Sequence, residues 1–262
     1  MINKRIKIGF FDSGVGGISV MAHAVNEVKN ADYIYYADTD HVPYGKKKPE
    51  EVVEYSISAV SCLIEQGAEI IVVACNTATS MAIKTLRATF DIPIIGMEPA
   101  VKPASVKHHG EKILVCATPL TINGKKLHDL IDENYAGSVY PTLVAAPELV
   151  TFAENSVFDT ETVVGYLKTI IDTRERYGAV VLGCTHFSYF RDSFKELLGD
   201  TDIIDGTEGT VNRMKYMMEQ LGTAPVSDGE RGHIEYFVSG KSVTDEKTLA
   251  YFKLLEEKAL LK

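Results

Sequence analysis

The sequence has no excess of positive charge. Its 27 Lys and Arg residues are outnumbered by 36 Asp and Glu residues, which leaves a formal charge of −9. Proteins that bind the phosphate backbone present a basic surface, so we do not expect nucleic acid as a partner. Its 262 residues, 45% hydrophobic and 24% charged, argue against disorder and suffice for one large or two smaller α/β domains.

Long apolar runs are also missing. No stretch approaches the ~18 to 20 apolar residues that cross a bilayer, so no membrane partner is expected. The N-terminus runs from charged residues into a glycine-rich loop rather than into the apolar region of a signal peptide. We therefore expect a cytoplasmic protein.

Cysteine is scarce and widely spaced. The four cysteines are Cys62, Cys75, Cys116 and Cys184, with no Cys-x-x-Cys pair. This spacing predicts neither a disulfide framework nor a zinc ribbon. His108 and His109 have no third ligand at metal spacing, so we expect no metal site.

Short β-branched runs alternate with longer helical patterns along the chain. Such alternation predicts βαβ units and parallel sheets. An amphipathic helix is expected within 51–66, where apolar residues recur with a period near 3.6. Strands are expected at 7–12, 33–37, 70–74, 92–96, 112–117, 138–143, 179–183 and 203–205.

Two segments of the chain repeat one layout. In each segment a Gly-Ala pair is followed by an apolar run and then by a cysteine, which is Cys75 in the first segment and Cys184 in the second. The next strand begins 19 residues after each cysteine. The repeat predicts two related α/β units, about 5–97 and 111–206, followed by a tail. Because open α/β sheets bind ligands at the carboxyl ends of their strands, we expect the two thiols to meet across a cleft between the units.

Polar residues follow both of these cysteines, in Cys75-Asn76-Thr77 and in Cys184-Thr185-His186. A thiol at the first turn of a helix has its pKa lowered by unpaired N–H groups and by the helix dipole, so both thiols are expected to ionise near pH 7. The alternative for a single cysteine is a small buried hydrophobe. That alternative is favoured for Cys62 and Cys116, which have no such polar neighbours.

A matched pair of thiols suits a reaction that is nearly symmetric. In racemisation at a Cα carbon, one thiolate removes a proton from one face and the opposite thiol donates a proton to the other face. The repeat is thus typical of a two-base racemase.

A glycine turn, Asp12-Ser13-Gly14-Val15-Gly16-Gly17, follows the first strand. It fails as a dinucleotide fingerprint because Ser19 stands where a glycine or alanine is needed. We expect its backbone N–H groups to approach a small anionic ligand, with Asp12 as a polar or proton-handling group. The alternative for Asp12 is helix N-terminal capping. Segment 36–45 predicts a loop.

These residues resemble the motifs of the glutamate racemase family, cofactor-independent enzymes that supply D-glutamate for peptidoglycan. The matching segments span nearly the whole chain in order. They are Phe11-Asp-Ser-Gly-Val-Gly-Gly17, Ala37-Asp-Thr, Val42-Pro-Tyr-Gly45, Val73-Ala-Cys-Asn-Thr-Ala78, Gly96-Met-Glu-Pro99, Gly183-Cys-Thr-His186 and Val238-Ser-Gly240. One departure is Phe187-Ser188, where the family usually has Tyr-Pro. Because of this departure, the sequence does not fix where the following helix begins.

The resemblance implies two flavodoxin-like parallel-sheet domains, 1–97 with 207–262 and 98–206, with the active site in the cleft between them. It implies that Cys75 acts on D-glutamate and Cys184 on L-glutamate without a cofactor. From their places near the thiols, we expect Asp12 and His186 to assist proton movement at Cys75 and Cys184, respectively. The implied substrate contacts are Asp12, Ser13, Tyr44, Gly45, Asn76, Thr77, Thr118, Thr121, Glu154, Thr185 and His186.

Three alternatives stay open. The first is an aspartate or hydantoin racemase, although His186 after Cys184-Thr185 favours glutamate as the substrate. The second is a nucleotide-binding oxidoreductase, against which the broken fingerprint argues. The third is a non-catalytic binding role, against which the intact cysteine pair argues. The sequence does not fix the oligomeric state, and a homodimer is one assembly compatible with it.

Overall fold

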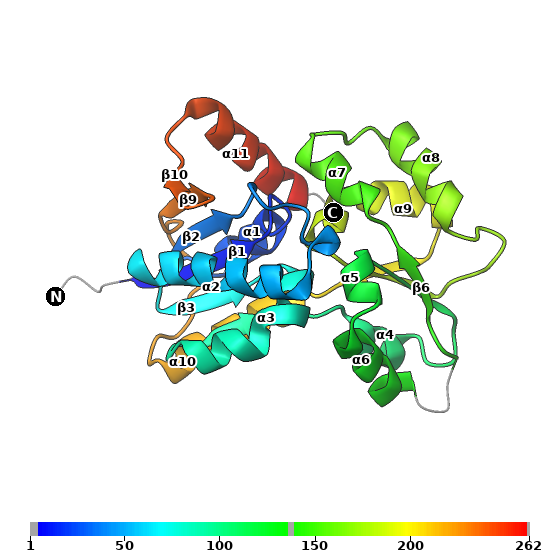
Figure 1. Ribbon diagram of the computed structural model, residues 1–262, viewed down its shortest axis with the longest axis horizontal. Helices are drawn as coiled ribbons and strands as arrows, with labels where there is room; N and C mark the ends of the chain where they lie inside the picture. Colours follow the sequence, from blue (N-terminus) through cyan, green and yellow to red (C-terminus); the bar gives the residue numbers. More distant parts are fainter. Residues whose placement is uncertain (1–4, 136–138, 261–262) are drawn as a thin grey trace.

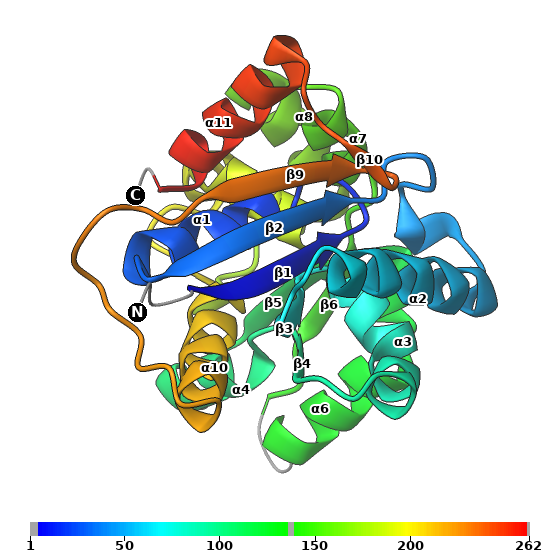
Figure 2. The ribbon, with the colours of Figure 1, turned by 90° about the vertical axis from the view of Figure 1, so that its left-hand side faces the viewer.

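The computed structural model describes residues 5–135 and 139–260, and its strands form two sheets that lie side by side (Figure 1). The larger sheet has six strands in the order β10-β9-β2-β1-β3-β4 (Figure 2). Its described strand pairs are parallel except for β10 with β9. The bounds are β1 (Ile6–Asp12), β2 (Ala31–Ala37), β3 (Ile70–Val73), β4 (Ile94–Gly96), β9 (Ile234–Val238) and β10 (Lys241–Ser242).

The smaller sheet has four parallel strands in the order β6-β5-β7-β8. Strands β5 and β7 are buried at every residue, as expected where helices cover both faces of a parallel sheet. The bounds are β5 (Ile113–Ala117), β6 (Thr142–Ala145), β7 (Ala179–Gly183) and β8 (Asp202–Asp205).

Helices cover both sheets. Those of the six-stranded sheet are α1 (Ile18–Glu27), α2 (Pro49–Glu65), α3 (Asn76–Thr89), α10 (Thr207–Gln220) and α11 (Glu246–Leu260). Those of the four-stranded sheet are α4 (Val101–Lys107), α5 (Pro119–Ile122), α6 (Lys125–Tyr135), α7 (Glu148–Glu154), α8 (Thr160–Ile170) and α9 (Arg191–Leu198). Two 3₁₀ helices, η1 (Tyr44–Lys46) and η2 (Thr185–Phe190), follow β2 and β7.

The apolar pattern of β1 explains how its two faces are filled. Ile8 and Phe10 belong to a core cluster with residues of α1, α10 and α11, whereas Phe11 belongs to a cluster with residues of α2 and α3. The first cluster continues into the second sheet through Phe187 and Leu182. The two sheets therefore share one continuous apolar core.

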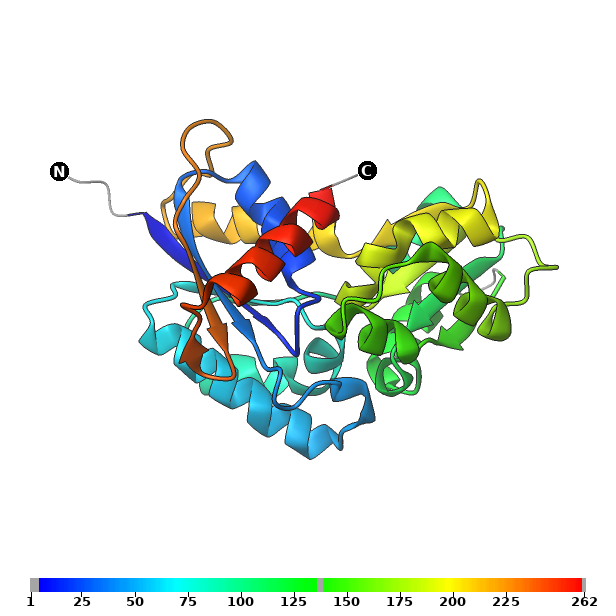
Figure 3. The same cartoon turned by 90° about the horizontal axis from the view of Figure 1, so that it is seen from above.

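The chain crosses between the sheets twice. It leaves the first sheet after β4, builds the second sheet, and returns through α10 to place β9 beside β2, where Ile234 pairs with Tyr33. Helix α11 then packs along α1 and reaches toward the second sheet (Figure 3). No described helix is long and apolar enough to cross a membrane.

The predicted α/β class with two parallel-sheet domains is confirmed, with some differences in detail. The strand expected at 138–143 is found as Thr142–Ala145, and Ser138 lies outside the described residues. The sequence pattern predicts no helices or strands in the tail, yet the tail contributes β9, β10 and two helices. Strand β9 is mostly half-buried and carries Glu235, and both residues of β10 are exposed, so neither strand has the continuous apolar run of a central strand.

Candidate active site

The carboxyl ends of strands from both sheets meet at one place. Several hydrogen bonds join the two sides there, and three of them show how a strand-end segment of one sheet meets a segment of the other. Thr185 Oγ1 donates to Asp12 Oδ2 at 3.0 Å, the backbone N–H of Val15 donates to Glu154 Oε1 at 2.9 Å, and the hydroxyls of Thr77 and Thr118 lie 3.0 Å apart. Residues predicted from distant parts of the sequence are thus brought together.

Cys75 lies at the N-cap of α3, and only Ala74 separates it from the end of β3. Its Sγ accepts a hydrogen bond from the backbone N–H of Ala78 at 3.4 Å and lies 3.6 Å from Ser13 Oγ, to which it donates. The expectation of a lowered pKa is wrong for this thiol. Burial, together with the charge of Asp12, raises the pKa of Cys75 to about 12 and outweighs the two hydrogen bonds.

Cys184 follows β7, but the segment after it is the 3₁₀ helix η2, and α9 begins only at Arg191. The α-helical turn expected directly after this thiol is therefore not found. Phe187 is fully buried in the shared core, and Ser188 Oγ donates to Asp205 Oδ2 at 3.1 Å. The Phe-Ser pair that departs from the family pattern is therefore packed in the core at Phe187 and hydrogen-bonded at Ser188.

His186 connects Cys184 to a carboxylate. Its Nδ1 lies 3.6 Å from Cys184 Sγ, and its Nε2 donates to Glu154 Oε1 at 2.6 Å. Burial alone would lower the pKa of His186, but the hydrogen bonds and charges of Cys184 and Glu154 outweigh burial and raise the pKa well above its usual range. The ring is thus suited to donate a hydrogen bond to a thiolate formed at Cys184.

Asp12 is fully buried beside both thiol segments. Its Oδ1 accepts from the backbone N–H of Gly14 at 3.1 Å, and its Oδ2 accepts from Thr185. Burial raises the pKa of Asp12 to about 6, although His186 and these hydrogen bonds act in the opposite direction. The N-cap of α1 is Gly17, so the capping interpretation of Asp12 is wrong.

The glycine loop fits closely against the second sheet. A Cβ atom at Gly14 would lie 1.9 Å from Glu154 Oε1, and one at Gly16 would lie 2.4 Å from Thr185 Oγ1. Tyr35 Oη donates to the Gly14 carbonyl at 2.7 Å, and Tyr189 Oη donates to the Val15 carbonyl at 2.9 Å. The sequence did not point to either tyrosine, because a tyrosine in an apolar strand or helix is expected to be an ordinary residue of the hydrophobic core.

Tyr44 and Gly45 lie on η1, which packs against α5. A Cβ atom at Gly45 would lie 2.8 Å from Thr118 Cβ, and Tyr44 Oη donates to Asp38 Oδ2 at 2.5 Å. The buried Asp38, whose oxygens also lie 2.9 Å from His41 Nδ1, received no role from the sequence. Its place in the Ala37-Asp-Thr motif was the available signal.

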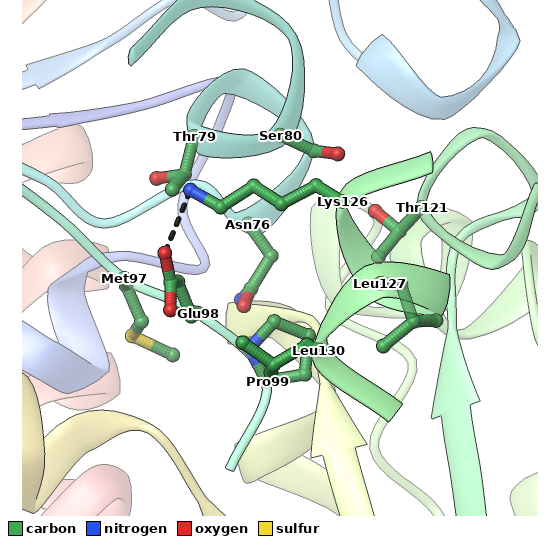
Figure 4. Close-up of a pocket in the computed structure, with 10 residues that line it drawn as sticks. All are labelled: Asn76, Thr79, Ser80, Met97, Glu98, Pro99, Thr121, Lys126, Leu127 and Leu130. Atoms are coloured by element: carbon green, nitrogen blue, oxygen red, sulfur yellow. Dashed lines mark ion pairs between the residues drawn. The ribbon is translucent and has the colours of Figure 1, made fainter. Parts of the chain in front are cut away.

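Asn76 and Thr121 line a small cavity beside this region (Figure 4). Asn76 is 3% exposed, and neither its amide nitrogen nor its amide oxygen has a hydrogen-bond partner among the described residues. Lys126 and Glu98 form an ion pair of 2.7 Å at the cavity. Thr121 Oγ1 also lies 3.4 Å from Thr77 Oγ1, so the cavity adjoins the group of hydroxyls formed by Thr77, Thr118 and Thr121.

The described residues include no group of three or more His, Cys, Asp or Glu side chains placed to hold a metal ion. The polar groups around the thiols are hydroxyls, backbone N–H groups, one imidazole and two carboxylates. This set can move protons and bind a small polar molecule.

Known proteins resemble this chain over nearly its full length. It is 48% identical over 256 residues to the Halothermothrix orenii protein named glutamate racemase, covering 96% of this chain and 100% of that protein. It is 43% identical to the Bacillus subtilis protein named glutamate racemase 2, with 96% of each covered.

A solved structure of Escherichia coli glutamate racemase, in complex with L-glutamate and the activator UDP-MurNAc-ala, superimposes with a TM-score of 0.81. The two sequences are 27% identical, and the match covers 97% of this chain and 96% of that one. The model of the Asp/Glu/Hydantoin racemase family matches residues 13–214. The chain therefore belongs to the Asp/Glu/Hydantoin racemase family.

Proposed function

We propose that the protein is an isomerase that interconverts L-glutamate and D-glutamate by a two-thiol mechanism without a cofactor. One observation carries this proposal: Cys75 and Cys184 lie at strand ends of two different sheets. Direct hydrogen bonds join the residues around these two strand ends. The named glutamate racemases at 43% and 48% identity support glutamate as the substrate.

The reaction moves one proton off the α-carbon and another onto it. The thiolate of one cysteine takes the α-proton and becomes a thiol, leaving the electron pair on the substrate, where the adjacent carboxylate delocalises it. The thiol of the other cysteine then donates its proton to the opposite face and becomes a thiolate. The enzyme ends with its two protonation states exchanged, ready for the mirror-image reaction.

The surroundings of the two thiols support different starting roles for them. Burial and the high pKa keep Cys75 as a thiol, which is the proton donor for L-glutamate turnover. His186, held by Glu154, can donate a hydrogen bond to a thiolate at Cys184. We propose that the resting protein is prepared for L-glutamate, with Cys184 as the base and Cys75 as the acid.

Substrate binding is proposed to rest on neutral donors. Ser13, Asn76, Thr77 and Thr185 supply hydroxyl, amide and backbone N–H groups for the two carboxylates of glutamate, and Asn76 has its amide group free to do so among the described residues. The other proposed contacts, Tyr44, Gly45, Thr118 and Thr121, line the same side of the site through η1 and α5.

In the cell, we propose that the protein acts in the cytoplasm and supplies D-glutamate for peptidoglycan. The complex of the Escherichia coli relative with its activator UDP-MurNAc-ala supports a link to cell-wall precursors. Complementation of a D-glutamate-requiring bacterial strain tests this role. A homodimer is the proposed assembly, and light scattering after gel filtration tests it.

The activity is tested by following the optical rotation of D-glutamate and L-glutamate, with both enantiomers of aspartate as controls. We expect both glutamate signals to decay to zero and the aspartate signals to stay constant. A carbonyl reagent or a chelator should leave the rate unchanged. Faster decay with aspartate would assign the protein to the alternative substrate.

A further inference from the structure

The C-terminal helix α11 connects the two sheets near the candidate active site. It packs on α1 of the first sheet, and its C-terminal end reaches toward the second sheet (Figure 3). Two of its side chains contact residues of the second sheet's side. Tyr251 Oη donates to the backbone carbonyl of Ala153 at 2.8 Å, and Lys258 Nζ lies 5.0 Å from the centre of the Phe158 ring. The hydroxyl of Tyr251 therefore joins positions 98 residues apart in the sequence.

The carbonyl that Tyr251 contacts belongs to the last turn of α7. Ala153 precedes Glu154, the residue that ends this seven-residue helix. The chain then turns through Ser156, which has a positive φ of 59°, and the N–H of Ser156 donates to the same Ala153 carbonyl at 3.1 Å. Because a helix this short has few internal hydrogen bonds, an outside donor at its end helps to fix the direction in which Glu154 leaves it.

The position of Glu154 matters because one of its carboxylate oxygens accepts two hydrogen bonds. Oε1 accepts from His186 Nε2 at 2.6 Å and from the backbone N–H of Val15 at 2.9 Å. Hydrogen bonds weaken steeply when distance or angle departs from the preferred range. A small displacement of the end of α7 would therefore alter the contact with His186, whose other ring nitrogen lies 3.6 Å from Cys184 Sγ.

We infer that Tyr251 is a positioning residue for the Glu154–His186 pair and, through this pair, for proton transfer at Cys184. This inference rests on the proposed two-thiol function. Tyr251 makes its contact on the Glu154 side of the site, whereas Cys75 is held by Ser13 and Ala78. Loss of the Tyr251 hydroxyl should therefore affect the Cys184 step more than the Cys75 step.

The experiment compares the wild-type protein with Tyr251→Phe, which removes only the hydroxyl. Rates are measured with L-glutamate and D-glutamate carrying hydrogen or deuterium at the α-carbon. We expect kcat of Tyr251→Phe to fall about threefold to tenfold, the effect of losing one hydrogen bond that matters in the transition state. The melting temperature is recorded for each variant.

The isotope effects separate positioning from general loosening of the fold. If the Cys184 step slows, removal of deuterium from L-glutamate becomes more rate-limiting, and the isotope effect on kcat/KM rises in that direction. With D-glutamate, reprotonation by Cys184 becomes limiting instead, and the isotope effect falls. A merely structural role would move both isotope effects together or not at all.

The matched control is Lys258→Met, which removes the contact of Lys258 with the Phe158 ring and leaves the Tyr251 hydroxyl in place. We expect its kcat and both isotope effects to match those of the wild type. Wild-type kcat in Tyr251→Phe, isotope effects that change in the same direction, or the same opposed shifts in Lys258→Met would overturn the inference. A wild-type protein that does not racemise glutamate would instead contradict the proposed function.

Discussion

The hydroxyl of Thr185 donates a 3.0 Å hydrogen bond to the carboxylate of Asp12, so the residue after one thiol is tied to the strand end beside the other. Both residues are buried, and neither sheet alone supplies the pair. The charge on Asp12 therefore acts on both halves of the site. It raises the pKa of Cys75 and is itself stabilised by His186.

The first prediction concerns the stability cost of this buried carboxyl group. Its folded-state pKa, about 6, is raised from 3.8, so the folded protein holds the proton more tightly than the unfolded chain does. The contribution of Asp12 to the free energy of unfolding is therefore highest below about pH 4, declines as the pH rises to about 6, and stays low above it. The decline is on the order of 3 kcal/mol at 1.36 kcal/mol for each pKa unit.

Asp12→Asn removes this titration, so we expect the stability of the variant relative to wild type to increase between pH 4 and pH 6. Urea unfolding at pH 4, 5, 6 and 7.5 measures the difference. A difference that does not change with pH would show that burial does not raise the pKa of this carboxyl group. Asp159→Asn, at the exposed N-cap of α8, is the control. The stability of this variant relative to wild type should not increase between pH 4 and pH 6.

The second prediction concerns proton handling. We expect Asp12→Asn and His186→Asn to lower kcat by about 10²-fold or more and to change KM less, because the lost groups assist proton transfer rather than hold the ground state. Steady-state rates in both directions provide the measurement. Wild-type kcat in both variants would remove the proposed proton roles of Asp12 and His186.

The third prediction tests the two thiols directly. Cys75→Ala and Cys184→Ala should each abolish racemisation in both directions, since the base for one enantiomer is the acid for the other. Cys62→Ser, on the outer helix α2, should keep wild-type activity. In D₂O, early product should carry deuterium while recovered substrate keeps its hydrogen. Early deuterium in recovered substrate, or a Cys184→Ala enzyme of wild-type rate, contradicts the mechanism.

The fourth prediction concerns the glycine loop. Gly14→Ala should lower activity by at least tenfold, because its Cβ would collide with Glu154 Oε1 and displace the carboxylate from His186. Gly165→Ala is the control: its Cβ meets nothing within 4 Å on α8, and alanine should stabilise that helix by up to ~1 kcal/mol. Activity assays and thermal melts on both variants test this contrast. Full activity in Gly14→Ala would mean that the loop can shift without harm.

Features with a local sequence pattern were predicted well. Strands β5 and β7 are continuous apolar runs, so their bounds follow closely from the sequence. The repeated cysteine layout predicted that Cys75 and Cys184 end strands of separate sheets, as they do. The domain boundaries near 97 and 207 and the catalytic roles of the site residues stay predictions.

Features that depend on tertiary closure were missed. The high pKa of Cys75 arises from burial by segments far away in the sequence, which local helix-dipole reasoning does not include. Tyr35 and Tyr189 donate to backbone carbonyls of the glycine loop, and Tyr251 donates to a backbone carbonyl in the last turn of α7. The sequence neighbours of these tyrosines give no sign of the contacts. The segment after Cys184 is a 3₁₀ helix rather than an α-helix, and Phe187 within it is buried in the shared core.

The return of the chain to pair Ile234 with Tyr33 has a consequence for synthesis on the ribosome. All four strands of the second sheet lie within 113–205, so that sheet can assemble while the rest of the chain is still being translated. The first sheet begins earlier in the sequence but cannot gain β9 until some two hundred further residues have been added after β2. The segment made first is thus completed last, and until then the edge of β2 is open to pairing with other chains.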